Sequence, residues 1–249
     1  MKALEFGDSS KRKLVLIHGF QMPYQIWNKY IEHYSSNFHI IVPILPGHYP
    51  NHEEDFVSFS VSAEEFENYY IPKYGADVFA VYAMSMGGVL AATLWRRDRL
   101  KIEKLIFDSS PLIPVNFLMK KMILNFYLTA THKSQKRDKK ALKQAESMCP
   151  KDCFDEFLNV LDFMTDTTIQ NCVKGVVDYR LPPNLDAENT RIYYFHGTTI
   201  NELLAKKSAG FISKHCKNSF IKEFKGKSHC ENMLFSPQIM IEELDGILI

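Results

Sequence analysis

The sequence predicts an α/β fold, with a mostly parallel central sheet flanked by helices and one helical insertion. Short apolar runs typical of buried parallel strands alternate with helical patterns from Lys13 to about Asp108. The alternation stops over residues 112–185, which carry helical patterns and no convincing strand, and resumes at Arg191. We therefore expect residues 1–111 and 186–249 to form the core and 112–185 to form the insertion.

In the first half, each predicted strand leads into a loop or a helix. The predicted strands are 14–17, 38–45, 78–83 and 105–107. Helices are predicted at 25–34, where apolar residues share one face, and at 86–97. A third is predicted to begin at Ser62, which forms an S-x-x-E capping box with Glu65, and to run toward Tyr70.

The insertion begins with an apolar stretch at 117–128. The stretch 133–143 follows, with six basic residues and one acidic residue. A solvated helix face is the favoured interpretation of this stretch, and contact with an anionic substrate tail or a membrane surface is the alternative. Beyond the insertion, strands are predicted at 191–195 and 220–224, with a helix at 202–216 between them and a last helix from Ser236-Pro237. All the strands are expected to run parallel.

Composition narrows the class of protein. The 249 residues are 46% hydrophobic and 24% charged, enough for one large domain, and the net charge of +1 argues against a nucleic-acid surface. No apolar run suits a signal peptide or a spanning helix, so we expect no integral membrane association. Five scattered cysteines, including Cys149 and Cys153, favour a reduced, cytoplasmic protein with incidental thiols and no metal site. Oligomeric state is left open.

The most informative segment is 76–90, which reads ADVFAVYAMSMGGVL. A predicted strand ends at Ser85 and a helix follows at once, the layout of a nucleophile elbow. The sharp turn needs small residues two positions before and after the serine, and these are Ala83 and Gly87. Ser85 is therefore a candidate nucleophile, with alanine at the usual first glycine.

A serine hydroxyl needs a base to take its proton and a third group to orient that base. His229 lies in the loop after the last predicted strand, at the sheet edge where the elbow should lie. It is the favoured candidate base. His18, which also ends a strand at this edge, is the alternative base, but it is expected instead to hold its own loop. The backbone N–H groups of Phe20 and Met86 are expected to stabilise an oxyanion.

Five segments together resemble the α/β-hydrolase family, in the family's order and across nearly the whole chain. They are His18-Gly19-Phe20, Pro46-Gly47-His48, residues 83–88, His196-Gly197 and residues 226–229. The resemblance implies a serine hydrolase fold without a cofactor. It also implies that residues 112–185 form the helical cap (lid), which encloses the substrate pocket together with the core.

The acid is where the chain departs from the family pattern. Family members commonly place an aspartate shortly after the glycine that ends the penultimate strand, but residues 198–202 read TTINE. Glu202 is the nearest carboxylate and the favoured acid, although it would also suit the first turn of a helix. Asp108, at the end of the preceding strand, is the alternative that some family members use. Glu231 is expected to face solvent.

The resulting hypothesis is a carboxylesterase or lipase-like enzyme acting on a small-molecule ester. Pocket walls are expected from the apolar residues Met84, Phe117, Leu118 and Met122, so the acyl or alkyl group should be apolar. Thioesterase, acyltransferase or C–C bond hydrolase activity on the same residues is an alternative. A ligand-binding protein that lost the chemistry is another, since a fold does not establish a function.

Overall fold

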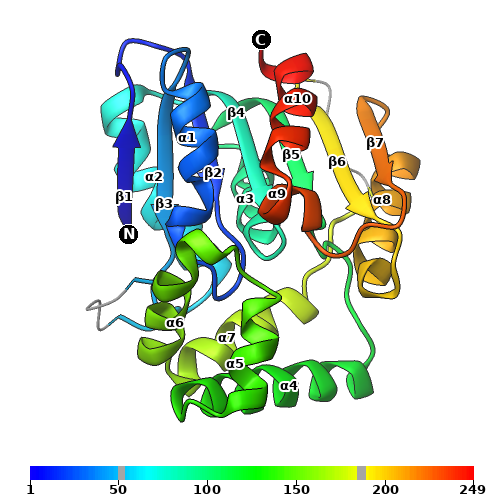
Figure 1. Cartoon of the computed structure of the whole chain (residues 1–249). Helices are drawn as coiled ribbons and strands as arrows, with labels where there is room; N and C mark the ends of the chain where they lie inside the picture. The colour runs from blue at the N-terminus through cyan, green and yellow to red at the C-terminus, as the bar shows by residue number, and fades with distance from the viewer. Residues whose placement is uncertain (50–53, 184–188) are drawn as a thin grey trace.

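The computed structural model describes residues 1–49, 54–183 and 189–249. A seven-stranded sheet in the order β1-β3-β2-β4-β5-β6-β7 runs through the molecule, with helices on both faces (Figure 1). The strands are β1 Lys2–Phe6, β2 Lys13–Ile17, β3 His39–Ile44, β4 Asp77–Met84, β5 Lys101–Asp108, β6 Arg191–Gly197 and β7 Ser219–Phe224. The predicted fold class is confirmed.

The first strand corrects the expectation that all strands run parallel. β1 was not predicted and pairs antiparallel with β3, with Lys2 opposite Ile44 and Phe6 opposite Ile40. It lies at the edge of the sheet and is only partly buried. An edge strand covered on one side needs no continuous apolar run, so its sequence carries little strand signal.

Helices of the core cover both faces of the sheet (Figure 1). Val15 and Ile17 of β2 pack in one cluster with residues of α2, α3 and α8, whereas Leu14 and Leu16 pack in another with residues of α1 and α10. The core helices are η1 Tyr24–Trp27, α1 Asn28–Tyr34, α2 Phe59–Tyr74, α3 Gly87–Arg97, η3 Ile200–Glu202, α8 Leu203–His215, α9 Glu231–Phe235 and α10 Pro237–Leu248.

The start of α2 differs from the prediction. The helix begins at Phe59, and the Ser58 hydroxyl accepts a hydrogen bond from the backbone N–H of Val61. Ser62 is buried inside the helix and caps nothing. Ser58 has no Glu or Gln three positions later, so the capping-box pattern pointed to the second serine instead.

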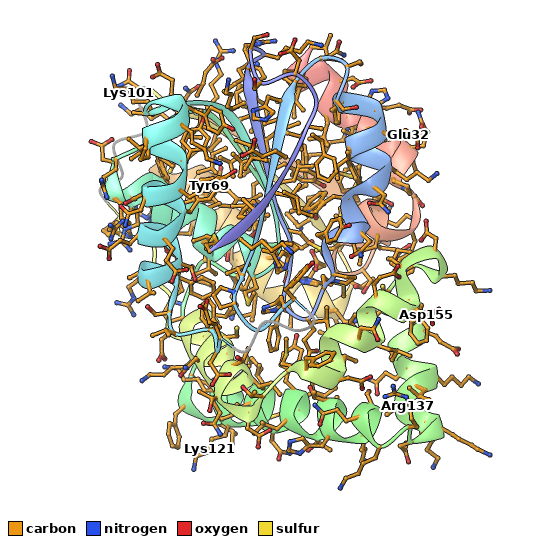
Figure 2. All side chains as sticks on the ribbon, turned by 90° about the vertical axis from the view of Figure 1, so that its left-hand side faces the viewer. Glu32, Tyr69, Lys101, Lys121, Arg137 and Asp155 are labelled. Carbon is orange, nitrogen blue, oxygen red and sulfur yellow. The ribbon has the colours of Figure 1, made fainter. Side chains whose placement is uncertain are left out.

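The described residues of the insertion, 112–183, form helices and no strand, and lie across the carboxyl ends of the parallel strands (Figure 1). It contains α4 Phe117–Gln135, α5 Lys139–Glu146, η2 Lys151–Cys153, α6 Phe154–Phe163 and α7 Asp166–Val177. The six basic residues of 133–143 are exposed, and Arg137 pairs with Asp162 at 2.7 Å. Figure 2 shows Lys121, Arg137 and Asp155 pointing outward from this layer. No helix among the described residues is long and apolar enough to cross a membrane.

Candidate active site

Ser85 lies on a strained turn between β4 and α3. Its φ of +48° is in the left-handed region, which non-glycine residues seldom adopt. The Ser85 N–H donates to the Asp108 carbonyl oxygen at 2.7 Å, and its own carbonyl oxygen accepts from the Gly88 N–H at 3.0 Å. A Cβ on Gly87 would lie 2.5 Å from the His18 carbonyl oxygen, which explains why this position is glycine. The predicted strand-to-helix turn is present.

His229 connects Ser85 to Glu202. Its Nε2 lies 2.8 Å from Ser85 Oγ, and its Nδ1 lies 2.7 Å from Glu202 Oε1. In the tautomer that fits these contacts, Nδ1–H donates to the carboxylate and Nε2 accepts from the serine hydroxyl. The structure thus brings three predicted residues together from the carboxyl ends of β4, β6 and β7. Glu231, expected to face solvent, is 33% exposed and pairs with Lys227.

Glu202 is enclosed by hydrogen-bond donors. Only 1% of the residue is exposed, and Oε2 accepts from the Ser109 hydroxyl at 2.8 Å and the Gly197 N–H at 2.9 Å. Burial by itself raises the pKa of this carboxyl, but the bonds from His229, Ser109 and Gly197 outweigh it and leave the pKa below its ordinary value. Glu202 is therefore ionised at neutral pH and suited to orient an imidazole.

Asp108 is buried nearby, but its carboxylate contacts residues other than His229. Its carboxylate accepts from the Tyr82 hydroxyl at 3.0 Å, and its Oδ1 lies 3.2 Å from the Ser109 hydroxyl, whose single hydrogen goes to Glu202 at the shorter distance. Neither contact involves His229, and burial raises the pKa of Asp108 to about 6. Of the two candidate acids, the one in hydrogen-bond contact with His229 is Glu202.

Ser109 is a residue of the site that sequence reasoning missed. Its hydroxyl donates to Glu202 and accepts from the backbone N–H of Cys230 at 3.2 Å, next to His229. Its φ of +52° turns the chain sharply after β5. The run Asp108-Ser109-Ser110-Pro111 indicated that the strand ends there, but not where the hydroxyl would point.

Phe20 and Met86, whose backbone N–H groups were expected to stabilise an oxyanion, lie beside Ser85 in the cavity wall. Within the described part of the chain, neither the Phe20 nor the Met86 N–H donates a hydrogen bond, and both residues line the cavity beside Ser85. His18 lies behind the Phe20 loop, where its Nε2 accepts from the Leu45 N–H at 3.2 Å. Burial lowers the pKa of His18 to about 4, so it stays neutral and holds the loop, as expected.

The cavity has a volume of about 840 Å³ and lies between the core and the α4–α7 layer. Met84 and Met122 line it, as predicted, but Phe117 and Leu118 do not. These two residues are 70% and 68% exposed at the start of α4. At about 100° per residue they lie about 200° and 100° around the helix from Met119, which does face the cavity. The prediction that they form pocket walls is wrong.

No protein-family model and no curated protein sequence matches this chain. Solved structures do match along its whole length. A protein from Desulfitobacterium hafniense, described as a candidate member of the alpha/beta hydrolase family, superposes with a TM-score of 0.80 and 18% identity over 100% of both chains. The chain has the α/β-hydrolase fold.

Two further matches to this fold are esterases. One belongs to the carboxylesterases of the archaeon Nitrososphaera gargenis, with a TM-score of 0.74, 15% identity, and coverage of 99% of this chain and 93% of that chain. The other is a thermophilic esterase from Thermogutta terrifontis, with a TM-score of 0.70, 16% identity, and coverage of 99% and 92%. Identities this low support the fold and leave the reaction to be argued from the site.

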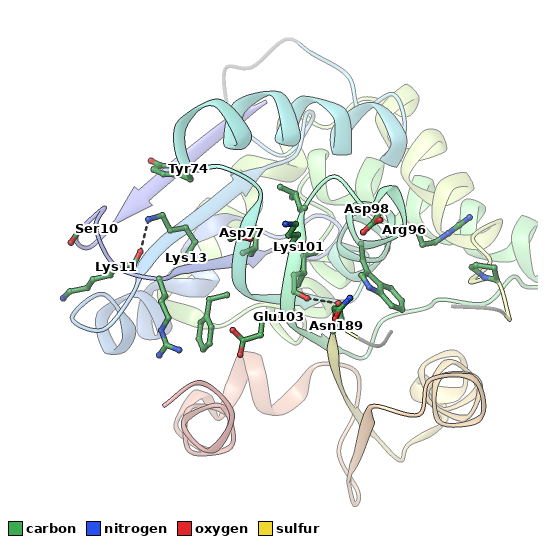
Figure 3. Close-up of a pocket in the computed structure, with 18 residues that line it drawn as sticks. Ser10, Lys11, Lys13, Tyr74, Asp77, Arg96, Asp98, Lys101, Glu103 and Asn189 are labelled. Carbon is green, nitrogen blue, oxygen red and sulfur yellow. Dashed lines mark hydrogen bonds between the residues drawn. The ribbon is translucent and has the colours of Figure 1, made fainter. Parts of the chain in front are cut away.

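A second cavity lies at the end of the sheet opposite to Ser85 (Figure 3). Its volume is about 1200 Å³, and residues at the amino ends of β2, β4, β5 and β6 line it, including Lys13, Asp77 and Lys101. None of the predicted site residues borders it. In open α/β sheets ligands bind outside the carboxyl ends of the strands, so the smaller cavity at Ser85 is the candidate site.

The cysteines form no metal centre within the described residues, which contain no group of three or more potential ligands. Cys149 and Cys153 are both buried, with their sulfur atoms 3.4 Å apart. The hydrogen bond with Cys153, together with burial, raises the pKa of the Cys149 thiol far above its ordinary value, which makes it a poor nucleophile.

Replacing Asp108 with asparagine is expected to make the protein more stable at neutral pH. The folded-state pKa of about 6 exceeds the ordinary 3.8, so folding favours the protonated form. The contribution of Asp108 to the free energy of unfolding is fully present below pH 3.8 and is lost as pH rises through about 6. Asp108→Asn removes the ionisation, and urea unfolding should show a gain of up to about 3 kcal/mol at pH 7.5. At pH 4 the gain should be near zero. A difference that does not vary with pH would contradict the prediction.

Proposed function

We propose that the protein is a serine hydrolase that cleaves a carboxylic ester with an apolar acyl or alkyl group. The observation that carries the proposal is the hydrogen-bonded set of Ser85, His229 and Glu202, of which Ser85 and His229 line an apolar cavity. The similarity to two esterases agrees with it. In this proposal residues 112–185 act as the cap of the enzyme.

The first half of the reaction forms an acyl-enzyme. Ser85 Oγ attacks the ester carbonyl carbon while His229 Nε2 takes its proton, and the carbonyl oxygen becomes an oxyanion. The unpaired N–H groups of Phe20 and Met86 are the proposed donors to that oxyanion, helped by the positive end of α3. His229 then gives its proton to the departing alcohol, and Ser85 remains esterified.

The second half repeats these steps with water. The oxygen of a water molecule attacks the acyl carbon while His229 takes a proton from that water. His229 then gives the proton to Ser85 Oγ as the bond between the acyl group and Ser85 breaks, and the carboxylic acid leaves. Throughout, the Glu202 carboxylate keeps the Nδ1–H of His229 pointed inward and stabilises the imidazolium that forms after each proton transfer.

A fluorophosphonate probe tests the serine directly. Native protein should be labelled on Ser85, and Ser85→Ala and heat-denatured protein should not, because the probe needs a serine activated by its base. Ser228→Ala is a matched control: this serine lines the same cavity, but its hydroxyl accepts from Asn201 at 3.3 Å, whereas His229 Nε2 bonds to Ser85. Folded protein that stays unlabelled, or equal labelling of Ser85→Ala, would refute the proposal.

The same groups would also serve thioester, acyl-transfer or C–C cleavage chemistry. Each of these begins with attack by an activated serine or a proton transfer to the leaving group, so the geometry does not rank them. Turnover of matched esters, thioesters and vinylogous diketones by one preparation ranks them. We expect the esters to be cleaved with the highest kcat/KM.

A further inference from the structure

The wall of the cavity has an unusual composition. Within the described part of the chain, no lysine, arginine, aspartate or glutamate side chain lines it. Of the chain's ten methionines, the six that line it are Met22, Met84, Met86, Met119, Met122 and Met148. The two nearby carboxylates, Glu202 and Asp108, are 1% and 4% exposed and already hydrogen-bonded. Apart from the imidazole of His229, a ligand in the cavity therefore meets hydroxyls, amides, sulfur and hydrocarbon.

Such a wall disfavours charged substrates. Moving an ionised group from water into an apolar site without an opposite charge costs several kcal/mol. The polar side chains in the wall, such as Gln144, Ser147 and Asn201, carry no charge that could compensate a carboxylate or phosphate. The entrance is also apolar: Met122, Phe126 and Phe235 line the cavity and are 65%, 44% and 46% exposed.

The methionines that line the cavity with Ser85 come from separate parts of the chain. Met84 and Met86 precede and follow Ser85, and they pack in the two core clusters on opposite faces of the sheet. Met119 and Met122 come from α4, and Met148 comes from the segment after α5. An unbranched thioether side chain adopts many rotamers at similar energy, so it can refit around ligands of different shape.

We propose that the substrates are uncharged esters of apolar acids, and that the wall adapts to acyl groups of several shapes instead of matching one. This inference rests on the proposed serine hydrolase function. It extends that function by stating which esters are poor substrates and why.

Charge is tested with a matched pair of esters. Methyl p-nitrophenyl glutarate and p-nitrophenyl hydrogen glutarate differ by one methyl group, which masks a carboxylate. Release of p-nitrophenolate from the neutral ester should have a kcat/KM at least about a hundredfold higher, because the carboxylate must give up its hydration in the cavity. Equal values, with Ser85→Ala inactive on both, would overturn the inference and leave the serine mechanism standing. No turnover or labelling at all would instead refute the proposed function.

An engineered charge supplies the complementary test. Met122 is 65% exposed at the entrance, so Met122→Arg should fold. It should raise kcat/KM for the carboxylate ester about tenfold relative to Met122→Gln, because an arginine can pair with the carboxylate. The neutral ester should show no such gain. A gain on both esters alike would contradict an effect of charge.

Shape is tested with p-nitrophenyl octanoate, cyclohexanecarboxylate and benzoate. For the native protein we expect the three kcat/KM values to lie within about a hundredfold of one another, as a flexible thioether wall allows. Replacing Met119 and Met148 with leucine keeps the volume but adds a branch, and should widen that spread about tenfold. If kcat/KM of the native protein for one of these esters exceeds the other two by more than a thousandfold, the proposal that the wall adapts is wrong. If the double variant unfolds at a much lower temperature than the native protein, the single Met119→Leu variant takes its place in this comparison.

Discussion

Replacing Glu202 with glutamine is expected to lower kcat about ten-thousandfold, whereas Asp108→Asn should cost less than about tenfold. Glu202 is the carboxylate in contact with His229, with Nδ1 and Oε1 2.7 Å apart. Glutamine keeps the size of the side chain but not the charge, so the imidazole is free to adopt the tautomer that cannot take the serine proton. Asp108 accepts a hydrogen bond from Tyr82 instead and influences His229 only from a distance.

The measurement is a comparison of kcat and KM on a neutral p-nitrophenyl ester for native protein and the two variants. KM should change little in Glu202→Gln, because Glu202 lies behind the histidine and does not line the cavity. Thermal unfolding of each variant shows whether the fold survives. A larger loss of kcat in Asp108→Asn than in Glu202→Gln would assign the acid to Asp108. A trivial loss in both would mean that the histidine is oriented by other groups.

Much of this fold was predictable because buried parallel strands leave a strong local signal. β4 is buried along nearly its whole length, and its apolar run marked it clearly. β1 went unnoticed because its five residues, KALEF, form no continuous apolar run. Helix α2 was placed too late because Ser58 caps it without the glutamate that completes a capping box.

The site was predictable to the extent that order along the chain implies position on the sheet. Ser85 and His229 follow β4 and β7, so parallel strands bring them to one edge. Which carboxylate meets the histidine depends on side-chain placement within a few ångströms, and sequence could only favour Glu202. Ser109 escaped notice because its role follows from a left-handed backbone conformation. Phe117 and Leu118 were misplaced because the rotation of α4 depends on its packing against α6 and α7.

Replacing Gly87 with alanine is expected to destabilise the protein by about 3 kcal/mol or more and to abolish activity at the working temperature. A Cβ at this position would lie 2.5 Å from the His18 carbonyl oxygen and 2.6 Å from that of Ile17. Both are backbone atoms at the end of β2, and β2 is held in register with β4 through Ile17 and Ala83. No side-chain rotation can relieve such a contact, so the backbone itself must move.

The movement that relieves the clash separates α3 from the end of β2. It would carry Met86 away from Phe20, and with it one of the two proposed oxyanion donors, so any protein that still folds should lose activity. Gly210→Ala is the control: Gly210 lies inside α8 with no atom within 4 Å of a Cβ, and alanine there should be neutral or stabilise by up to about 1 kcal/mol. Urea unfolding and ester hydrolysis on both variants measure the two effects. Native-like stability in Gly87→Ala would show that the elbow can yield, and the small residue two positions after Ser85 would then need an explanation other than crowding.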